Sequence, residues 1–260
     1  MSQSTGRITT EPRSGLNYKV LLLILGLAVV YQTFNSILPE IEGELSPIDY
    51  VLTIPLVICA ISSFLVARRY TPSDVFGPAY FALGVGFTAY AIGEITWNYY
   101  VGVLKIYPYP SIADIFFFAI YPFMIFHLIR NIKFFSRKIS LRTKTWLAAI
   151  PVALVLMYTY FTFQQDNYIL FDYYYGLPFV AASATTLSFA ILGAQVFRQS
   201  ALAAVWALLA VGIFLNTFGD VNYYYLEIFG LYTRTHFVNV LWFVAPLLII
   251  YSLYRHYKII

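Results

Sequence analysis

Charged side chains are scarce in this sequence. Aspartate, glutamate, lysine and arginine together make up 11% of its 260 residues, whereas a soluble globular domain usually contains about 25%. Hydrophobic residues make up 60% and aromatic residues 20%. No single soluble core of this length buries so much apolar surface, so the composition excludes a soluble domain and predicts an integral membrane protein.

Cysteine and the common catalytic motifs are also nearly absent. The single cysteine, Cys59, lies within an apolar run, which excludes a disulfide framework and a CxxC metal-binding motif. GxGxxG, P-loop, GxSxG and HExxH motifs are missing, so no cofactor is identified and no metal site is predicted. The net charge of +4 is not taken as a nucleic-acid signal, because the distribution of the basic residues has another explanation.

Long apolar runs dominate what is present. Crossing the hydrocarbon core takes about 20 mainly apolar residues, and eight segments reach that length. They are residues 18–38, 47–67, 78–101, 111–130, 145–164, 171–196, 202–227 and 236–255. The fold is therefore predicted to be all-α, an integral membrane protein with eight transmembrane helices. The polar stretch 1–17 is predicted to be a retained tail rather than a cleaved signal peptide.

Basic residues are distributed unevenly between the predicted loops. With the N-terminus inside, fourteen of the sixteen lysines and arginines fall in inner segments, and only Lys105 and Arg234 lie outside. This asymmetry follows the positive-inside rule and predicts a multi-pass cell-membrane protein with both termini cytoplasmic. The basic loop at 133–144 is expected to lie against anionic lipid head groups, so the lipid bilayer is the predicted partner and nucleic acid is not.

Two pairs of segments indicate an internal duplication. Residues 48–57 align with 171–180, and residues 85–100 align with 211–226. The alignment pairs Asp49 with Asp172, Pro55 with Pro178, Gly86 with Gly212, Gly93 with Gly219, and Glu94 with Asp220. The two matches occur in the same order along the chain, which makes a duplication the better explanation than chance.

The duplication predicts the domain organisation. Four-helix repeats would span 18–132 and 145–260 and would be joined by the basic linker 133–144. Each repeat has an even number of helices, so both enter the membrane from the same side. The repeats are therefore predicted to be parallel and related by an axis along the membrane normal.

Polar side chains gather toward the outer ends of the predicted helices. Ionisable groups within a span are costly unless they are paired or hydrated, so they indicate function by default. Positions four apart share a helix face, which places Tyr90, Glu94 and Asn98 in one stripe and Asn216, Asp220 and Tyr224 in another. Together the stripes predict a polar, ligand-binding cavity open to the outside. The candidate residues are Asp49, Tyr90, Glu94, Trp97, Asn98, Asp114, Asp172, Asn216, Asp220, Asn222, Tyr224 and His236.

Structural roles are open alternatives for part of this set. Tryptophan and tyrosine commonly anchor helices at the membrane interface. Asp49 and Asp172 each begin a predicted helix, where a carboxylate interacts favourably with the helix dipole. Asp114 follows Ser111 at capping-box spacing, so it is predicted to be a helix starter first, with Ser111 at the N-cap. Glu94 and Asp220 lie within helices, so capping does not explain them, and His236 could pair with an acid.

The segment around Asp114 resembles a known family. PYPSIADIFFFAIYP (108–122), with Gly93 and Glu94 upstream, resembles a multi-helix membrane sensory module that precedes diguanylate cyclase, phosphodiesterase or kinase domains in bacteria. The matching positions in the segment are Pro108, Pro110, Ser111, Ala113, Asp114, Tyr121 and Pro122. The resemblance implies a sensor. Since this chain ends shortly after its last helix, such a sensor would be expected to act through a separate membrane or cytoplasmic protein partner.

Three functions are therefore weighed. The first is a sensor-like or ligand-binding subunit that acts through partners. The second is a membrane-embedded lipid hydrolase with Glu94 and Asp220 as acid and base, since Gly93-Glu94 and Gly219-Asp220 resemble the Gly-Asp pairs of lysoplasmalogenase-like enzymes. The third is a small-solute transporter built on the two halves. The residues alone leave open whether the protein is an enzyme.

Overall fold

The computed structural model describes residues 16–38, 45–71, 73–136 and 139–259. All regular secondary structure in these residues is helical, and eight helices are long and apolar enough to cross a membrane. They are α1 (Tyr18–Ile37), α2 (Pro47–Arg69), α3 (Phe76–Tyr99), α4 (Ala113–Phe135), α5 (Leu141–Phe163), α6 (Leu170–Phe197), α7 (Ala203–Glu227) and α8 (Val238–Ile259), with a π-helical turn, η1 (Tyr100–Leu104), directly after α3. The prediction of an all-helical, multi-pass membrane protein is confirmed.

The helix ends differ from the predicted spans by a few residues. The largest difference lies around the predicted linker 133–144, where α4 continues to Phe135 and α5 begins at Leu141. A hydropathy pattern ends a span at its first charges, whereas a helix satisfies its own backbone hydrogen bonds and can extend beyond the hydrocarbon. The predicted tail, 1–17, lies outside the described residues except for its last two.

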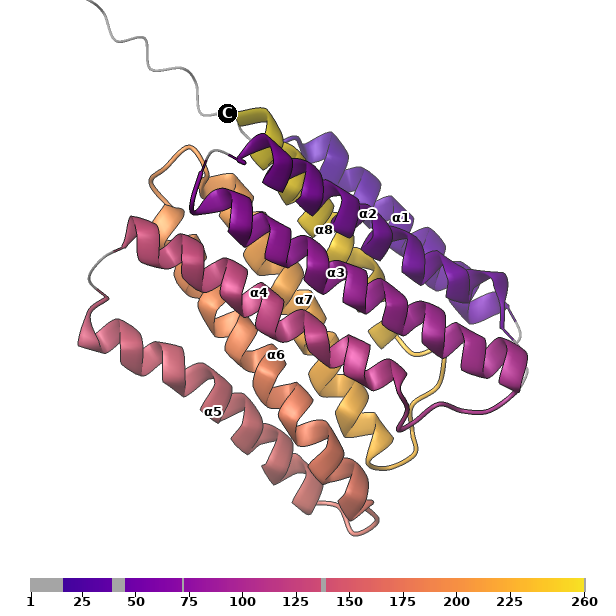
Figure 1. The fold of residues 1–260 in the computed structure, drawn as a ribbon. Coiled ribbons are helices and arrows are strands. Elements are labelled where there is room, and N and C mark those ends of the chain that lie inside the picture. Colours follow the sequence, from indigo (N-terminus) through magenta and orange to yellow (C-terminus); the bar gives the residue numbers. More distant parts are fainter. Residues whose placement is uncertain (1–15, 39–44, 72, 137–138, 260) are drawn as a thin grey trace, which may run out of the picture.

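Six of the helices form a closed ring. Going around it, α2 packs against α3, α3 against α4, α4 against α6, α6 against α7, α7 against α8, and α8 against α2. The remaining helices lie at the periphery on opposite sides, with α1 mainly against α8 and α5 mainly against α6 (Figure 1). We call α2–α4 and α6–α8 the six-helix ring.

Glycines permit close packing at two helix pairs in this ring. A Cβ atom added at Gly86 of α3 would lie 3.1 Å from Phe123 Cβ on α4. A Cβ atom added at Gly212 of α7 would lie 2.8 Å from Ile249 and 2.9 Å from the carbonyl oxygen of Ala245, both on α8. A larger side chain at Gly212 would therefore push α7 and α8 apart, whereas one at Gly86 would require α3 and α4 to shift by a few tenths of an ångström.

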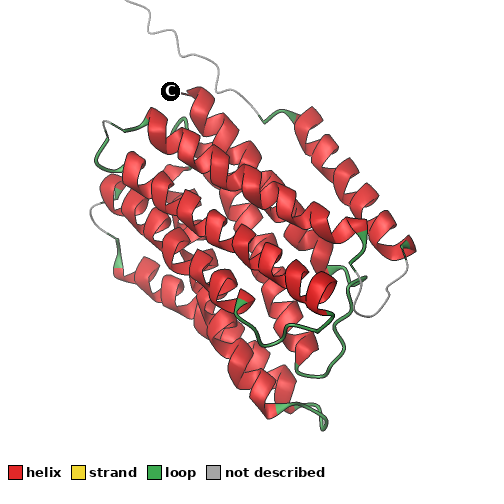
Figure 2. Ribbon diagram, turned by 45° about the vertical axis from the view of Figure 1, so that its right-hand side comes forward, coloured by secondary structure: helices red, strands yellow, loops and turns green. Residues whose placement is uncertain are grey.

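The two ends of the six-helix ring differ in charge and in structure. The start of α1 and the end of α8 lie at the same end (Figure 1). In the described part of the chain, every lysine and arginine except Lys105 and Arg234 lies toward that end. The opposite end is crossed by two irregular segments, 105–112 and 228–237 (Figure 2), and it holds the polar residues singled out in the sequence.

Candidate functional site

A cavity of about 340 Å³ opens within the six-helix ring at the end crossed by segments 105–112 and 228–237. Pockets of this size hold small organic ligands. All six helices of the ring contribute to its lining. Eight of the twelve candidate residues line it, namely Asp49, Tyr90, Glu94, Trp97, Asn98, Asp114, Asp220 and Tyr224. The sequence pattern therefore located most of the cavity, and the role of these residues in binding stays a prediction.

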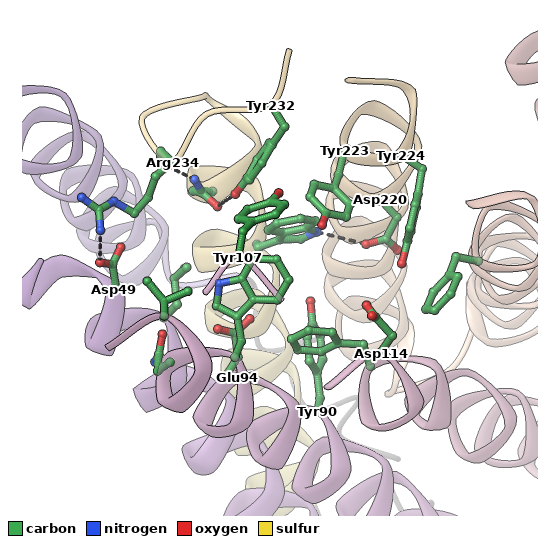
Figure 3. A pocket seen from close by; sticks show the side chains of 18 of the residues that line it. Asp49, Tyr90, Glu94, Tyr107, Asp114, Asp220, Tyr223, Tyr224, Tyr232 and Arg234 are labelled. Atoms are coloured by element: carbon green, nitrogen blue, oxygen red, sulfur yellow. Dashed lines mark hydrogen bonds and ion pairs between the residues drawn. The ribbon is translucent and has the colours of Figure 1, made fainter. Parts of the chain in front are cut away.

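The stripe on α3 faces the cavity without partners. Tyr90, Glu94 and Asn98 all line it, as the spacing of four predicts. The side chains of these three residues form no hydrogen bond or ion pair with any residue that the structure describes. Figure 3 shows Tyr90 and Glu94 reaching from α3 into the space below Tyr107, with Tyr223 and Asp220 of α7 on the other side. These polar groups are therefore available to a ligand.

Asp220 on α7 is held very differently. Its Oδ2 atom accepts hydrogen bonds from Ser183 Oγ (2.5 Å), Tyr121 Oη (2.9 Å) and Asn216 Nδ2 (2.8 Å). Its Oδ1 atom accepts one from Trp242 Nε1 (3.0 Å). Asp220 is 5% exposed, and a buried carboxylate is stable only when donors replace its hydration. Four donors from α4, α6, α7 and α8 do so here, which ties these helices together.

Asp49 joins α2 to the segment before α8. Its Oδ2 atom accepts a hydrogen bond from the Ser46 N–H (2.7 Å) at the start of α2, as expected for an acid in the first helical turn. The same oxygen lies 2.8 Å from Arg234 Nη1. Other contacts hold this segment in place, because the Arg234 carbonyl accepts hydrogen bonds from Asn35 Nδ2 and Asn239 Nδ2. Arg234 thus forms part of a fixed wall of the cavity.

The Asp49–Arg234 pair is expected to contribute about 1 kcal/mol to the free energy of unfolding. The two side chains are only 10% and 20% exposed, so screening is weaker than at an open surface. A double-mutant cycle with Asp49→Asn and Arg234→Gln, read from the midpoint of SDS-induced unfolding, measures this coupling. Fully additive effects of the two substitutions would contradict the assignment.

Asp114 both starts α4 and lines the cavity. Its Oδ2 atom accepts a hydrogen bond from the Ser111 N–H (2.6 Å), which is the contact that the acid makes in a capping box. The prediction that Ser111 is the N-cap is wrong by one residue, because α4 begins at Ala113 and Ile112 precedes it. The Ser111 hydroxyl accepts from the Ala113 N–H instead (3.1 Å), a local turn that serine favours.

Four candidate residues do not line the cavity. Asn216 lies beneath it and bonds to Asp220. Asn222 donates to the Phe218 carbonyl of its own helix (2.7 Å). His236 accepts from the Val238 N–H at the start of α8 (3.4 Å), and burial lowers its pKa. Asp172 lies in the first turn of α6. Asn222 and Asp172 were predicted from their position along a helix, which does not determine the side of the helix that faces the cavity.

The sequence reasoning did not single out the aromatic residues that close the cavity. Tyr107 lies in segment 105–112 and donates a short hydrogen bond to Glu227 at the end of α7; burial and this carboxylate raise the pKa of Tyr107. Tyr232 donates to Asn239 Oδ1 (3.0 Å), and burial raises the pKa of Tyr232. For the Tyr107–Glu227 contact, the sequence offered one signal, which is that an acid, Glu227, ends the predicted span 202–227.

Comparison of the chain with protein-family models, with curated proteins and with solved structures gives no match. The assignment of a function therefore depends on the geometry of the cavity.

Proposed function

We propose that the protein is a sensor-like, ligand-binding membrane protein that binds a small molecule in the cavity of the six-helix ring and acts through a protein partner. The observation that carries the proposal is the α3 stripe, where an acid, an amide and a phenol face a cavity of about 340 Å³ without partners in the described chain. Polar groups lose hydration on burial, so a row of them left without partners favours a ligand.

The proposed orientation places the cavity on the outer side of the membrane. Its support is the charge distribution, since only Lys105 and Arg234 of the described basic residues lie at the cavity end. The positive-inside rule then assigns the end that holds the chain termini to the cytoplasm. A ligand would reach the site from outside, and the termini would lie where a cytoplasmic partner can bind.

The proposed duplication gives the cavity a position between two halves. Reciprocal packing supports it, because α2 contacts α8 of the other half and α6 contacts α4. The equivalent glycines, Gly86 and Gly212, face Phe123 and Ile249, which are themselves equivalent at the same shift along the chain. The peripheral helices depart from this symmetry, since α1 packs mainly on α8 and α5 mainly on α6. A ligand bound between the halves could bias how they pack, as a sensor requires.

Residues of the sensory-module resemblance gather at the same place. Glu94, Asp114 and Tyr121 line the cavity, and Tyr121 also donates to Asp220. This placement supports a sensor. The hydrolase hypothesis has less support, because both oxygens of Asp220 are occupied by protein donors and a general acid or base must reach its substrate.

Ligand-dependent thermal stabilisation tests this proposal. Screening the purified protein against a library of small metabolites is expected to give compounds that raise Tm, since a ligand that binds only the folded state stabilises it. Leu52→Trp, which adds bulk to the cavity lining, should remove the shift for all of them. If no compound gives a shift that Leu52→Trp removes, the proposal is contradicted.

A further inference from the structure

The four acids that line the cavity are not equivalent. Asp49 is paired with Arg234, Asp114 accepts from Ser111, and Asp220 accepts from four side chains. Glu94 alone has no hydrogen bond or ion pair with any residue the structure describes. Among these four acids, Glu94 is therefore the one to which the described chain supplies neither a hydrogen-bond donor nor an ion-pair partner.

The neighbours of Glu94 on α3 carry polar groups that can donate and accept hydrogen bonds. Asn98 lies one turn further along and is 7% exposed, and its side chain has no partner in the described chain. Tyr90 lies one turn earlier, and its hydroxyl also has no hydrogen-bond partner in the described chain. Lys105 lies on the cavity lining, yet within the described residues no ion pair joins it to Glu94. The stripe thus offers one carboxyl group flanked by an amide and a phenol hydroxyl, each of which has an oxygen that can accept a hydrogen bond.

Aromatic rings form the surrounding walls. Trp97 and Phe117 lie on the side of Glu94, with their ring centroids 6.4 Å apart, and Tyr107 lies edge-on to Trp97 at 5.5 Å. On the opposite side Tyr223 contacts Tyr232 (4.8 Å) and Trp242 (5.2 Å). Aromatic faces attract cations through their quadrupoles, and cages of such rings recognise alkylated ammonium groups.

We propose that the cavity binds an organic ammonium ion, with the cationic nitrogen beside Glu94 and its alkyl or aryl body against the aromatic walls. This inference rests on the proposed ligand-binding function and specifies its chemical class. A carboxylate compensates the charge, and the rings replace the hydration of the apolar body. Where the ammonium group carries protons, the oxygens of Asn98 and Tyr90 can accept its N–H hydrogen bonds. An anionic ligand would gain no such interaction from the Glu94 carboxyl group. The ammonium group could belong to a soluble amine or to a lipid head group.

Charged probes and their neutral counterparts test the inference. Choline is compared with 3,3-dimethylbutan-1-ol, and 2-phenylethylamine with 2-phenylethanol, using Tm and isothermal titration of the protein in phosphatidylglycerol nanodiscs. At least one of the cations is expected to bind and raise Tm, whereas its neutral counterpart is not. Glu94→Gln should weaken binding at least about tenfold, and Trp97→Leu by roughly 2- to 30-fold.

A matched control removes another acid at the same end of the molecule. Asp166→Asn alters an exposed residue of the α5–α6 connection that does not line the cavity, so it should leave binding unchanged. Equal binding of the neutral compounds, or unchanged binding in Glu94→Gln, would overturn the assignment of the ammonium ion. If neither cation binds while library compounds give shifts that Leu52→Trp removes, the ligand class is wrong and the proposed function stands. If no compound shifts Tm, both fail.

The source of the ammonium group is separated by changing the lipid. If phosphatidylcholine nanodiscs stabilise the wild type but not Glu94→Gln without added ligand, the occupant is a lipid head group. If only the added soluble cation stabilises the protein, the occupant is a free amine. Either result supports the ammonium site.

Discussion

Asp220→Ala is expected to lower the free energy of unfolding by about 3–5 kcal/mol. The substitution removes the acceptor of four hydrogen bonds, from Tyr121, Ser183, Asn216 and Trp242. Each buried donor left without an acceptor keeps the cost of its lost hydration. The donors come from four helices of the six-helix ring, so the loss weakens contacts throughout it. The midpoint of SDS-induced unfolding measures the effect.

Glu94→Ala is the matched control for this prediction. It removes the acid that the duplication aligns with Asp220, yet it breaks no hydrogen bond to a described residue. The free energy of unfolding is therefore expected to change by less than about 1 kcal/mol. Equal destabilisation by the two substitutions would contradict the division into one structural acid and one acid available to ligand.

Gly212→Leu is expected to lower the free energy of unfolding by about 2–3 kcal/mol. Even a Cβ atom at this position would lie 2.9 Å from the carbonyl oxygen of Ala245. Backbone atoms cannot rotate away as a side chain can, so α7 and α8 must move apart. Since Asp220 on α7 bonds to Trp242 on α8, the same displacement should also weaken ligand binding. The unfolding midpoint and the ligand-dependent Tm shift report the two effects separately.

Gly26→Leu provides the control, because nothing lies within 4 Å of a Cβ atom at Gly26 in the peripheral helix α1. Leucine has the higher helix propensity, so this variant should be as stable as the wild type or slightly more stable. A Gly212→Leu variant with wild-type stability would contradict the prediction, because it would show that α7 and α8 can move apart with no loss of stability.

The contrast between Glu94 and Asp220 is the feature that spacing could not reveal. Both acids follow a glycine, lie in the C-terminal half of a long apolar helix and have polar residues four positions away. Their surroundings differ because α4, α6 and α8 supply donors to Asp220, from residues 99, 37 and 22 positions away in the chain. No comparable donors reach Glu94 from the described part of the chain.

The sequence by itself determined the number and approximate limits of the helices. In lipid a backbone must satisfy its own hydrogen bonds, so an apolar run of sufficient length becomes a helix whatever surrounds it. The polar stripe on α3 followed for a similarly local reason, since residues four apart share a face. Only the tertiary structure decided which polar residues face the cavity unpaired and which form hydrogen bonds or ion pairs within the protein. Asp49 contacts Arg234, 185 positions away, and Tyr107 contacts Glu227, 120 positions away. Such contacts depend on how the helices are arranged around the ring, which no local pattern in the sequence determines.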